Sequence, residues 1–164
     1  MDNFEEDFNL AILQACEIHG VDVLKDLQRV CLDTLVSKTD VLACLPTGFG
    51  KSLIFQAWPT VCSLLSTKYP SKWPKDAMVL IVCPLESIME DQVKLLNEKG
   101  LSAARAGENT VTDEKICNGE YSFVYGSPET FVGNAFWRKA LQSPLFRDRL
   151  IGLAVDEVHT VVQW

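Results

Sequence analysis

A short apolar run followed by Pro46-Thr47-Gly48-Phe49-Gly50-Lys51-Ser52 constrains this chain more than any other feature of its sequence. Two glycines allow backbone amides to crowd around an anion, a lysine can reach terminal phosphates, and a serine hydroxyl is placed for Mg²⁺. The segment predicts a loop that binds nucleotide phosphates. The alternative is an ordinary glycine-containing turn, because Leu45 stands where the general pattern has its first glycine.

The residues around this loop favour the nucleotide-binding interpretation. Asp40 to Leu45 is short and almost wholly apolar, as expected of a buried parallel strand. Downstream, Ile54, Trp58, Val61 and Leu65 recur at helical spacing, and Pro59 is expected to kink this helix without ending it. A loop between a strand and a helix is the arrangement that a phosphate-binding loop requires.

Composition limits the class of protein. The chain has 164 residues, of which 48% are hydrophobic and 23% charged, and it contains no apolar run of membrane-spanning length. Its first residues are acidic where a signal peptide would be basic, so we expect an intracellular protein that does not enter a membrane. The net charge of −7 implies that any contact with nucleic acid is local or completed elsewhere.

The six cysteines are scattered and form no C-x-x-C pair. Cys44 and Cys83 fall inside predicted buried strands, so reduced core thiols are favoured over a zinc site or a disulfide framework.

Alternating apolar patterns predict a doubly wound α/β fold with a mainly parallel sheet. We expect a helix from Phe4 to Gly20 and a second from Leu24 to Val36, which would bury Leu27, Val30, Cys31 and Leu35. After a polar surface loop over 66–76, whose lysines provide a weaker alternative as phosphate contacts, strands are predicted over 77–83, 102–105, 121–125 and 150–155. Helices are predicted over 85–100, 113–117 and 134–141.

The last predicted strand leads into Asp156-Glu157-Val158-His159. Ligands bind at the carboxyl edge of an open parallel sheet, so these side chains are placed for nucleotide chemistry. Asp156 would hold Mg²⁺, Glu157 would orient or deprotonate the attacking water, and His159 would lie near the γ-phosphate. Taken alone, the acidic pair is equally compatible with loop residues that cap a strand. Together with the phosphate loop, it favours an ATPase.

With both motifs considered, the chain resembles the superfamily-two helicases and, within them, the RecQ-like DNA helicases. The segment 20–28 is similar to the family's adenine-recognition segment, and 45–56 is similar to its phosphate loop, including the non-glycine residue at Leu45. The segments 82–93 and 125–129 resemble two further family motifs, and Gln163-Trp164 follows the acidic pair as in RecQ-like proteins. The resemblance implies a RecA-like P-loop NTPase fold.

The resemblance also implies an activity: ATP-dependent unwinding of DNA with 3′-to-5′ polarity, with single-stranded DNA and duplex junctions as partners and with ATP and Mg²⁺ as cofactors. It implies nuclear localisation if the source is eukaryotic. The nucleotide-binding residues implied are Lys25, Gln28, Thr47, Gly48, Phe49, Gly50, Lys51 and Ser52, with Ser52 and Asp156 at the metal. Those implied for catalysis are Lys51, Asp156, Glu157 and His159. Those implied for nucleic-acid binding are Pro84, Leu85, Ser87, Ser127, Pro128, Glu129, Gln163 and Trp164.

Several positions depart from the family pattern. The family usually has an aromatic residue near Val21 and an arginine near Lys25, and Glu86, Val158 and Val162 also differ. None of these differences removes a catalytic group.

The domain organisation expected from the resemblance is an N-terminal helix over 1–20 and a first RecA-like domain over 21–164 that stops after the acidic pair. The second RecA-like domain, with its arginine finger, would be missing, as would a strand between the phosphate-loop strand and the acidic-pair strand. We therefore expect a fragment that is inactive alone. Two alternatives stay open: an RNA-dependent ATPase of the same superfamily, and a non-catalytic helicase-like module that binds nucleotide or a partner.

Overall fold

The computed structural model describes residues 3–159, which divide into two compact units with the boundary between Ala77 and Met78. We call them the N-terminal unit and the C-terminal unit. None of the helices among the described residues is long and apolar enough to cross a membrane.

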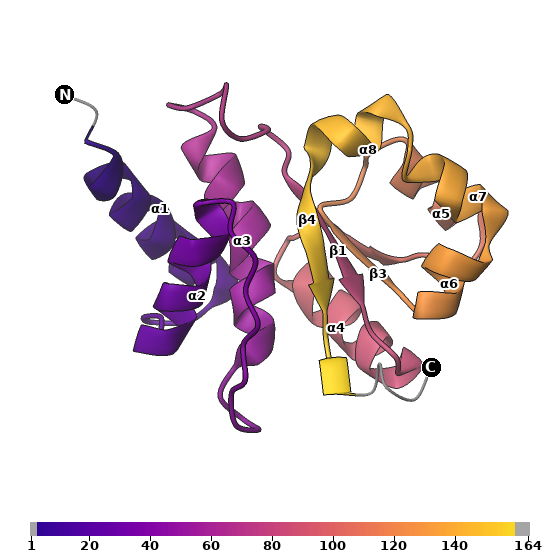
Figure 1. Cartoon of the computed structure of the whole chain (residues 1–164), viewed down its shortest axis with the longest axis horizontal. Coiled ribbons are helices and arrows are strands. Elements are labelled where there is room, and N and C mark those ends of the chain that lie inside the picture. The colour runs from indigo at the N-terminus through magenta and orange to yellow at the C-terminus, as the bar shows by residue number, and fades with distance from the viewer. Residues whose placement is uncertain (1–2, 160–164) are drawn as a thin grey trace. The chain divides into compact units, whose positions relative to one another are not determined.

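The N-terminal unit is built from three helices, α1 (Phe4–His19), α2 (Asp26–Val36) and α3 (Lys51–Leu65) (Figure 1). Helix α1 ends where predicted, because Gly20 adopts a left-handed conformation with φ of 71° and its amide closes the last turn. Helix α3 continues through Pro59, also as predicted. Both α1 and α2 contact α3, so α3 is the central helix of this unit.

The predicted buried face of α2 is wrong. Leu27 and Val30 are 51% and 57% exposed, and the buried residues are Gln28, Leu32 and Val36. These three lie four residues apart on one face of the helix. The apolar pattern pointed to the wrong face because a glutamine occupies one of the buried positions, where it contacts the phosphate loop.

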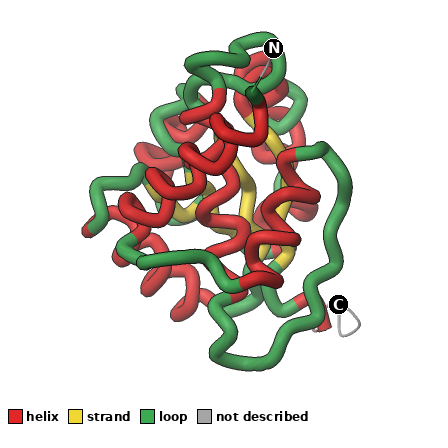
Figure 2. The backbone as a smooth tube through the Cα atoms, turned by 90° about the vertical axis from the view of Figure 1, so that its left-hand side faces the viewer, coloured by secondary structure: helices red, strands yellow, loops and turns green. Residues whose placement is uncertain are grey.

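The predicted strand over Asp40–Leu45 is also not formed. The chain between α2 and α3 is a long loop (Figures 1 and 2), in which Leu42 is 76% exposed and Cys44 is exposed. A strand requires a hydrogen-bonded neighbour, and among residues 3–159 none pairs with this segment. The expectation that Cys44 is a core thiol is wrong for the same reason, whereas Cys83 is fully buried.

The loop over 66–76 follows α3 in the chain and is anchored to α1. Trp73 is buried, with its ring stacked on Phe4 at a centroid distance of 5.7 Å. Lys68 forms an ion pair with Asp7, and Lys72 lies over the rings of this aromatic group. Most residues of this loop are exposed, as expected of a surface loop, and two of its three lysines have contacts within the N-terminal unit.

The C-terminal unit contains a four-stranded parallel sheet in the order β2-β3-β1-β4. Its strands are β1 (Met78–Val82), β2 (Ala103–Arg105), β3 (Phe123–Gly126) and β4 (Leu150–Val155), all close to the predicted ranges. All five residues of β1 are buried, as its continuous apolar run predicted. The α/β fold with a parallel sheet is confirmed.

Five helices accompany the sheet: α4 (Glu86–Glu98), α5 (Thr110–Cys117), α6 (Pro128–Gly133), α7 (Ala135–Ala140) and α8 (Pro144–Arg149). Alternate residues of β1 share one buried cluster with Ile116, Phe131, Trp137 and Phe146, which come from α5 to α8 in that order. Figure 1 shows these four helices gathered on one side of the strands.

Two of these helices, α6 and α8, were not predicted. Each is only six residues long, begins with proline and is preceded by a serine whose hydroxyl accepts a backbone N–H of the first turn. The capping signals were present in the sequence. Helices of this length carry too few residues to show a helical apolar repeat.

Candidate functional site

The predicted phosphate loop is a tight turn that opens directly into α3. The Phe49 amide donates to the Pro46 carbonyl at 3.2 Å, and Gly48 and Gly50 have φ of 78° and 87°. Thr47 and Gly48 are exposed, and no atom lies within 4 Å of the place where Gly48 would carry a Cβ. Left-handed glycines that lead into a helix N-terminus form a concave set of amides, which fits the phosphates of ATP.

Gln28 connects α2 to this loop. Its side chain is 3% exposed, and its amide nitrogen donates to the carbonyls of Gly50 at 2.9 Å and Phe49 at 3.3 Å. Its amide oxygen accepts the Lys25 N–H at 2.9 Å. Close contact also explains the glycine at position 50, because a Cβ there would lie 2.7 Å from the Gln28 nitrogen.

Lys25 makes a second connection to the loop. Its ammonium donates to the Phe49 carbonyl at 2.9 Å and lies 4.6 Å from the centre of the Phe49 ring. Sequence reasoning assigned Lys25 and Gln28 to adenine recognition by resemblance. It missed that both residues hold the backbone of the phosphate loop, and the polar residue within the apolar pattern of α2 was the available signal.

Lys51 and Ser52 are the first two residues of α3 and are half-buried. The Lys51 ammonium lies 3.4 Å from the Leu45 carbonyl, so this side chain folds back over its own loop. A lysine near the exposed loop amides supplies the positive charge that terminal phosphates need. A serine hydroxyl in the first turn is the usual single protein ligand of a phosphate-bound Mg²⁺.

The acidic pair lies at the carboxyl end of β4 in the C-terminal unit. The Asp156 amide donates to the Val82 carbonyl at 2.9 Å, which places the pair beside the end of β1. Glu157 has φ of 56°, a conformation that is strained for a residue other than glycine, and its amide donates to the Asp156 carboxylate at 3.0 Å. His159 forms an ion pair with Glu157 at 3.3 Å when its ring is protonated.

Cys83 is a neighbour of this pair that sequence reasoning treated only as a core thiol. Burial raises the pKa of the Cys83 thiol, a hydrogen bond with the backbone of Leu85 lowers it, and the negative charges of Asp156 and Glu157 raise it further. The thiol is therefore a neutral, apolar neighbour of the carboxylates. Cys83 directly follows β1, and β1 pairs with β4. The strand order, which the sequence did not show, is therefore what places this thiol beside the acidic pair.

The residues predicted to bind nucleic acid follow the neighbouring strands β1 and β3. Pro84, Leu85 and Ser87 follow β1, and Leu85 is 53% exposed. Ser127, Pro128 and Glu129 follow β3, where the Ser127 hydroxyl caps α6 by accepting the Thr130 amide at 3.2 Å. The structure brings these two groups to the same edge of the sheet. Gln163 and Trp164 lie outside the described residues.

A metal ion in this site would depend on more than protein ligands. Among residues 3–159 no group of three or more histidine, cysteine, aspartate or glutamate side chains is arranged to hold a metal. Mg²⁺ in ATPases is usually held by one or two protein oxygens together with phosphates and water, so the hydroxyl of Ser52 in the N-terminal unit and the carboxylate of Asp156 in the C-terminal unit are each a donor of a suitable type.

Comparison with known proteins gives a consistent family. A family model described as DEAD/DEAH box helicase matches residues 25–164. The chain is 29% identical to ATP-dependent DNA helicase Q1 of Rattus norvegicus, over 90% of this chain and 23% of that protein. It is 31% identical to ATP-dependent DNA helicase RecQ of Synechocystis, over 90% of this chain and 29% of that protein.

A third relative is ATP-dependent DNA helicase RecQ of Haemophilus influenzae, 26% identical over 98% of this chain and 24% of that protein. The chain spans about a quarter of the length of these relatives. The names of the relatives confirm the resemblance to RecQ-like helicases that the motifs predicted. The chain therefore belongs to the DEAD/DEAH box helicase family.

Proposed function

We propose that this chain provides the ATP-binding region of a RecQ-like DNA helicase that couples ATP hydrolysis to movement along single-stranded DNA. The observation that carries the proposal is the phosphate loop. Its two left-handed glycines lead into α3, and Gln28 and Lys25 donate hydrogen bonds to its backbone carbonyls. The similarity to named DNA helicases supports DNA as the substrate.

The residues predicted for catalysis and metal binding have separate roles in the proposed reaction. Lys51 binds the terminal phosphates, and Ser52 and Asp156 bind the metal. Glu157 orients the water that attacks the γ-phosphate and accepts its proton. Mg²⁺, when bound with ATP, neutralises charge that develops on the phosphate oxygens. His159 pairs with Glu157. A change at Glu157 during hydrolysis would therefore alter the contact that His159 makes.

Nucleotide binding tests the first half of this proposal. We expect residues 1–164 to bind a fluorescent ATP analogue and Lys51→Ala to weaken that binding at least about tenfold, because the lysine supplies a charge-assisted contact. Lys75→Ala is the matched control, since Lys75 is an exposed lysine of the same unit, outside the phosphate loop. Equal affinity of the Lys51 variant and the control would refute the assigned role.

Hydrolysis tests the second half, in a full-length helicase that carries this chain. We expect Glu157→Gln to keep ATP binding and to lose ATP hydrolysis, while Glu120→Gln, at an exposed position, changes neither. Hydrolysis by the Glu157 variant at the wild-type rate would contradict the proposal. Binding without hydrolysis by the wild-type protein would favour the non-catalytic module instead.

The nucleic acid and the direction of movement need their own measurements. Stimulation of ATP hydrolysis by single-stranded DNA but not by RNA is expected, and the reverse would favour an RNA-dependent enzyme. The 3′-to-5′ polarity implied by the family predicts strand displacement only from substrates with a 3′ single-stranded tail. A eukaryotic source would place such a protein in the nucleus.

A further inference from the structure

Arg105 lies at the carboxyl edge of the sheet between two glutamates. It is the last residue of β2, and of the four strands β2 alone ends in a basic residue. Its guanidinium Nη1 lies 3.2 Å from the Glu90 carboxylate and 3.8 Å from the Glu86 carboxylate, both on α4. In a chain with net charge −7, this positive group stands at the edge where nucleic acid is proposed to bind.

The ion pair between Arg105 and Glu86 is weak by its geometry. At 3.8 Å it is too long for a hydrogen bond, and the Glu86 side chain is 81% exposed, so solvent screens it. Both carboxylates approach the same nitrogen, Nη1, so neither forms the two parallel hydrogen bonds that make arginine pairs strong. Water or another anion can therefore replace Glu86 at low cost.

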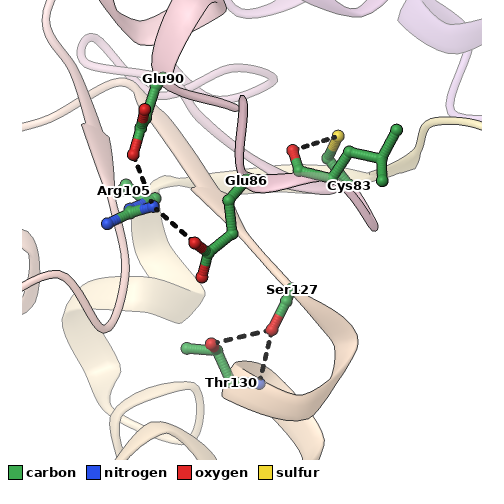
Figure 3. A network of polar contacts seen from close by, with 7 residues as sticks. Cys83, Glu86, Glu90, Arg105, Ser127 and Thr130 are labelled. Atoms are coloured by element: carbon green, nitrogen blue, oxygen red, sulfur yellow. Dashed lines mark hydrogen bonds and ion pairs between the residues drawn. The ribbon is translucent and has the colours of Figure 1, made fainter. Parts of the chain in front are cut away.

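The surroundings of Arg105 include Ser127, one of the residues predicted to bind nucleic acid. Figure 3 shows the Glu86 carboxylate directed toward Arg105, with Ser127 and Thr130 at the start of α6 nearby. Gly107, two residues after Arg105, approaches Thr130 so closely that a Cβ on the glycine would lie 3.2 Å from the threonine methyl group. The chain after β2 and the chain after β3 are thus in contact at this edge.

We propose that Arg105 binds a backbone phosphate of single-stranded DNA and that Glu86 competes with that phosphate for the guanidinium. The proposal rests on the proposed function, because it needs DNA at this edge. A phosphate presents several oxygens to the guanidinium fork and can form the two-nitrogen arrangement that Glu86 does not. Glu86 then leaves for solvent, where its exposed carboxylate is fully hydrated, and Glu90 keeps its contact.

The competition makes a specific prediction about two substitutions. Loss of the guanidinium in Arg105→Gln removes one phosphate contact, so affinity for oligo(dT) should fall about fivefold near 0.1 M salt and the salt slope should decrease by about 0.7. Loss of the competing charge in Glu86→Gln should raise affinity a few-fold. That increase should disappear in the Arg105→Gln background, because there is no longer a guanidinium to release.

The experiment measures fluorescence anisotropy of labelled oligo(dT) with residues 1–164 over a range of salt concentrations. Arg29 provides matched controls, because it also pairs with two carboxylates, Glu5 and Asp33, and is 30% exposed, but it lies on α2 in the N-terminal unit. Arg29→Gln and Asp33→Asn make the same changes in net charge and should leave the affinity and the salt slope unchanged. Arg105→Lys keeps the charge without the fork and should bind DNA with intermediate affinity.

The outcomes separate this proposal from the proposed function. If the chain binds oligo(dT) but Arg105→Gln has the wild-type affinity and slope, Arg105 is only a structural ion pair and the inference is wrong, while DNA binding stands. If the Glu86→Gln increase persists without Arg105, general repulsion explains it and the competition is refuted. If no variant binds oligo(dT), the DNA interface itself fails. Should Arg105→Gln not fold, Arg105→Lys and Glu86→Gln decide the matter.

Discussion

The contribution of the Gln28 side-chain amide to stability can be tested by replacing only its NH₂ group with oxygen. Gln28→Glu keeps the shape of the side chain and the oxygen that accepts the Lys25 N–H, but it removes the nitrogen that donates to the carbonyls of Phe49 and Gly50. Each of these two hydrogen bonds contributes about 0.5–1.5 kcal/mol to stability. A carboxylate held against two carbonyl oxygens adds repulsion, so we expect a total loss of about 2–4 kcal/mol near neutral pH.

The loss should depend on pH in a defined direction. Burial and the two facing carbonyls disfavour the charged form, so the pKa of the introduced carboxyl rises in the folded state above its unfolded value of about 4.3. The folded state then binds more protons than the unfolded state, and stability relative to wild type falls as pH increases through the raised pKa. The deficit should be smallest near about pH 4, where the protonated carboxyl again donates a hydrogen bond.

Urea unfolding of residues 1–164 at several pH values provides the assay, with Gln14→Glu as the control. Gln14 lies on the exposed face of α1, so its replacement should change stability by no more than about 0.5 kcal/mol. Both Gln28→Glu and Gln28→Ala should also weaken nucleotide binding, because the phosphate loop loses its support. A Gln28→Glu variant as stable as wild type at neutral pH would show that the amide nitrogen does not hold the loop.

Three further predictions concern single residues. Gly126→Ala should destabilise the C-terminal unit by about 1–3 kcal/mol in urea unfolding, because its Cβ would lie 2.5 Å from the Phe131 ring, and Phe131→Leu should recover part of the loss. Glu157→Gly should raise the free energy of unfolding by about 1 kcal/mol in the same assay, because glycine adopts the left-handed conformation of this position without strain. An unchanged or lower stability would show that Glu157 is not strained. Hydrogen bonding to Lys68 is the largest of the causes that lower the pKa of Asp7. The stability that Asp7 contributes is therefore present above its unfolded pKa and is lost as pH falls through the lower folded pKa. Asp7→Asn should reduce this loss of stability at acidic pH, and an identical dependence of stability on pH would refute the contact.

Much of the C-terminal unit was predictable because its strands are continuous apolar runs. The predicted strand over 150–155 coincides with β4, and the helix from Leu85 appears as α4 with Met89 and Leu96 buried. All residues of β1 and β3 are buried, which requires strands that are apolar along their whole length, whereas β4 is apolar without having a fully buried residue. The signal is therefore strong and local, and it also placed Asp156 at a strand end.

The N-terminal unit was less predictable because its important contacts are polar or depend on pairing. Gln28 is buried because it donates to loop carbonyls, a reason that no hydrophobic periodicity can show. The apolar residues before the phosphate loop satisfied the pattern of a strand, but a strand also needs a hydrogen-bonded neighbour. Without one this segment is a loop, and Leu42 is exposed.

The sequence by itself determined the phosphate loop, the acidic pair and the family, because these depend on residue types at fixed short spacing. Only the tertiary structure showed that Gln28 and Lys25 support the loop, that Cys83 lies beside the carboxylates and that Arg105 stands between two glutamates. Each of these contacts joins residues from different helices and strands. They depend on the order of strands and the facing of helices, which short-range spacing does not encode.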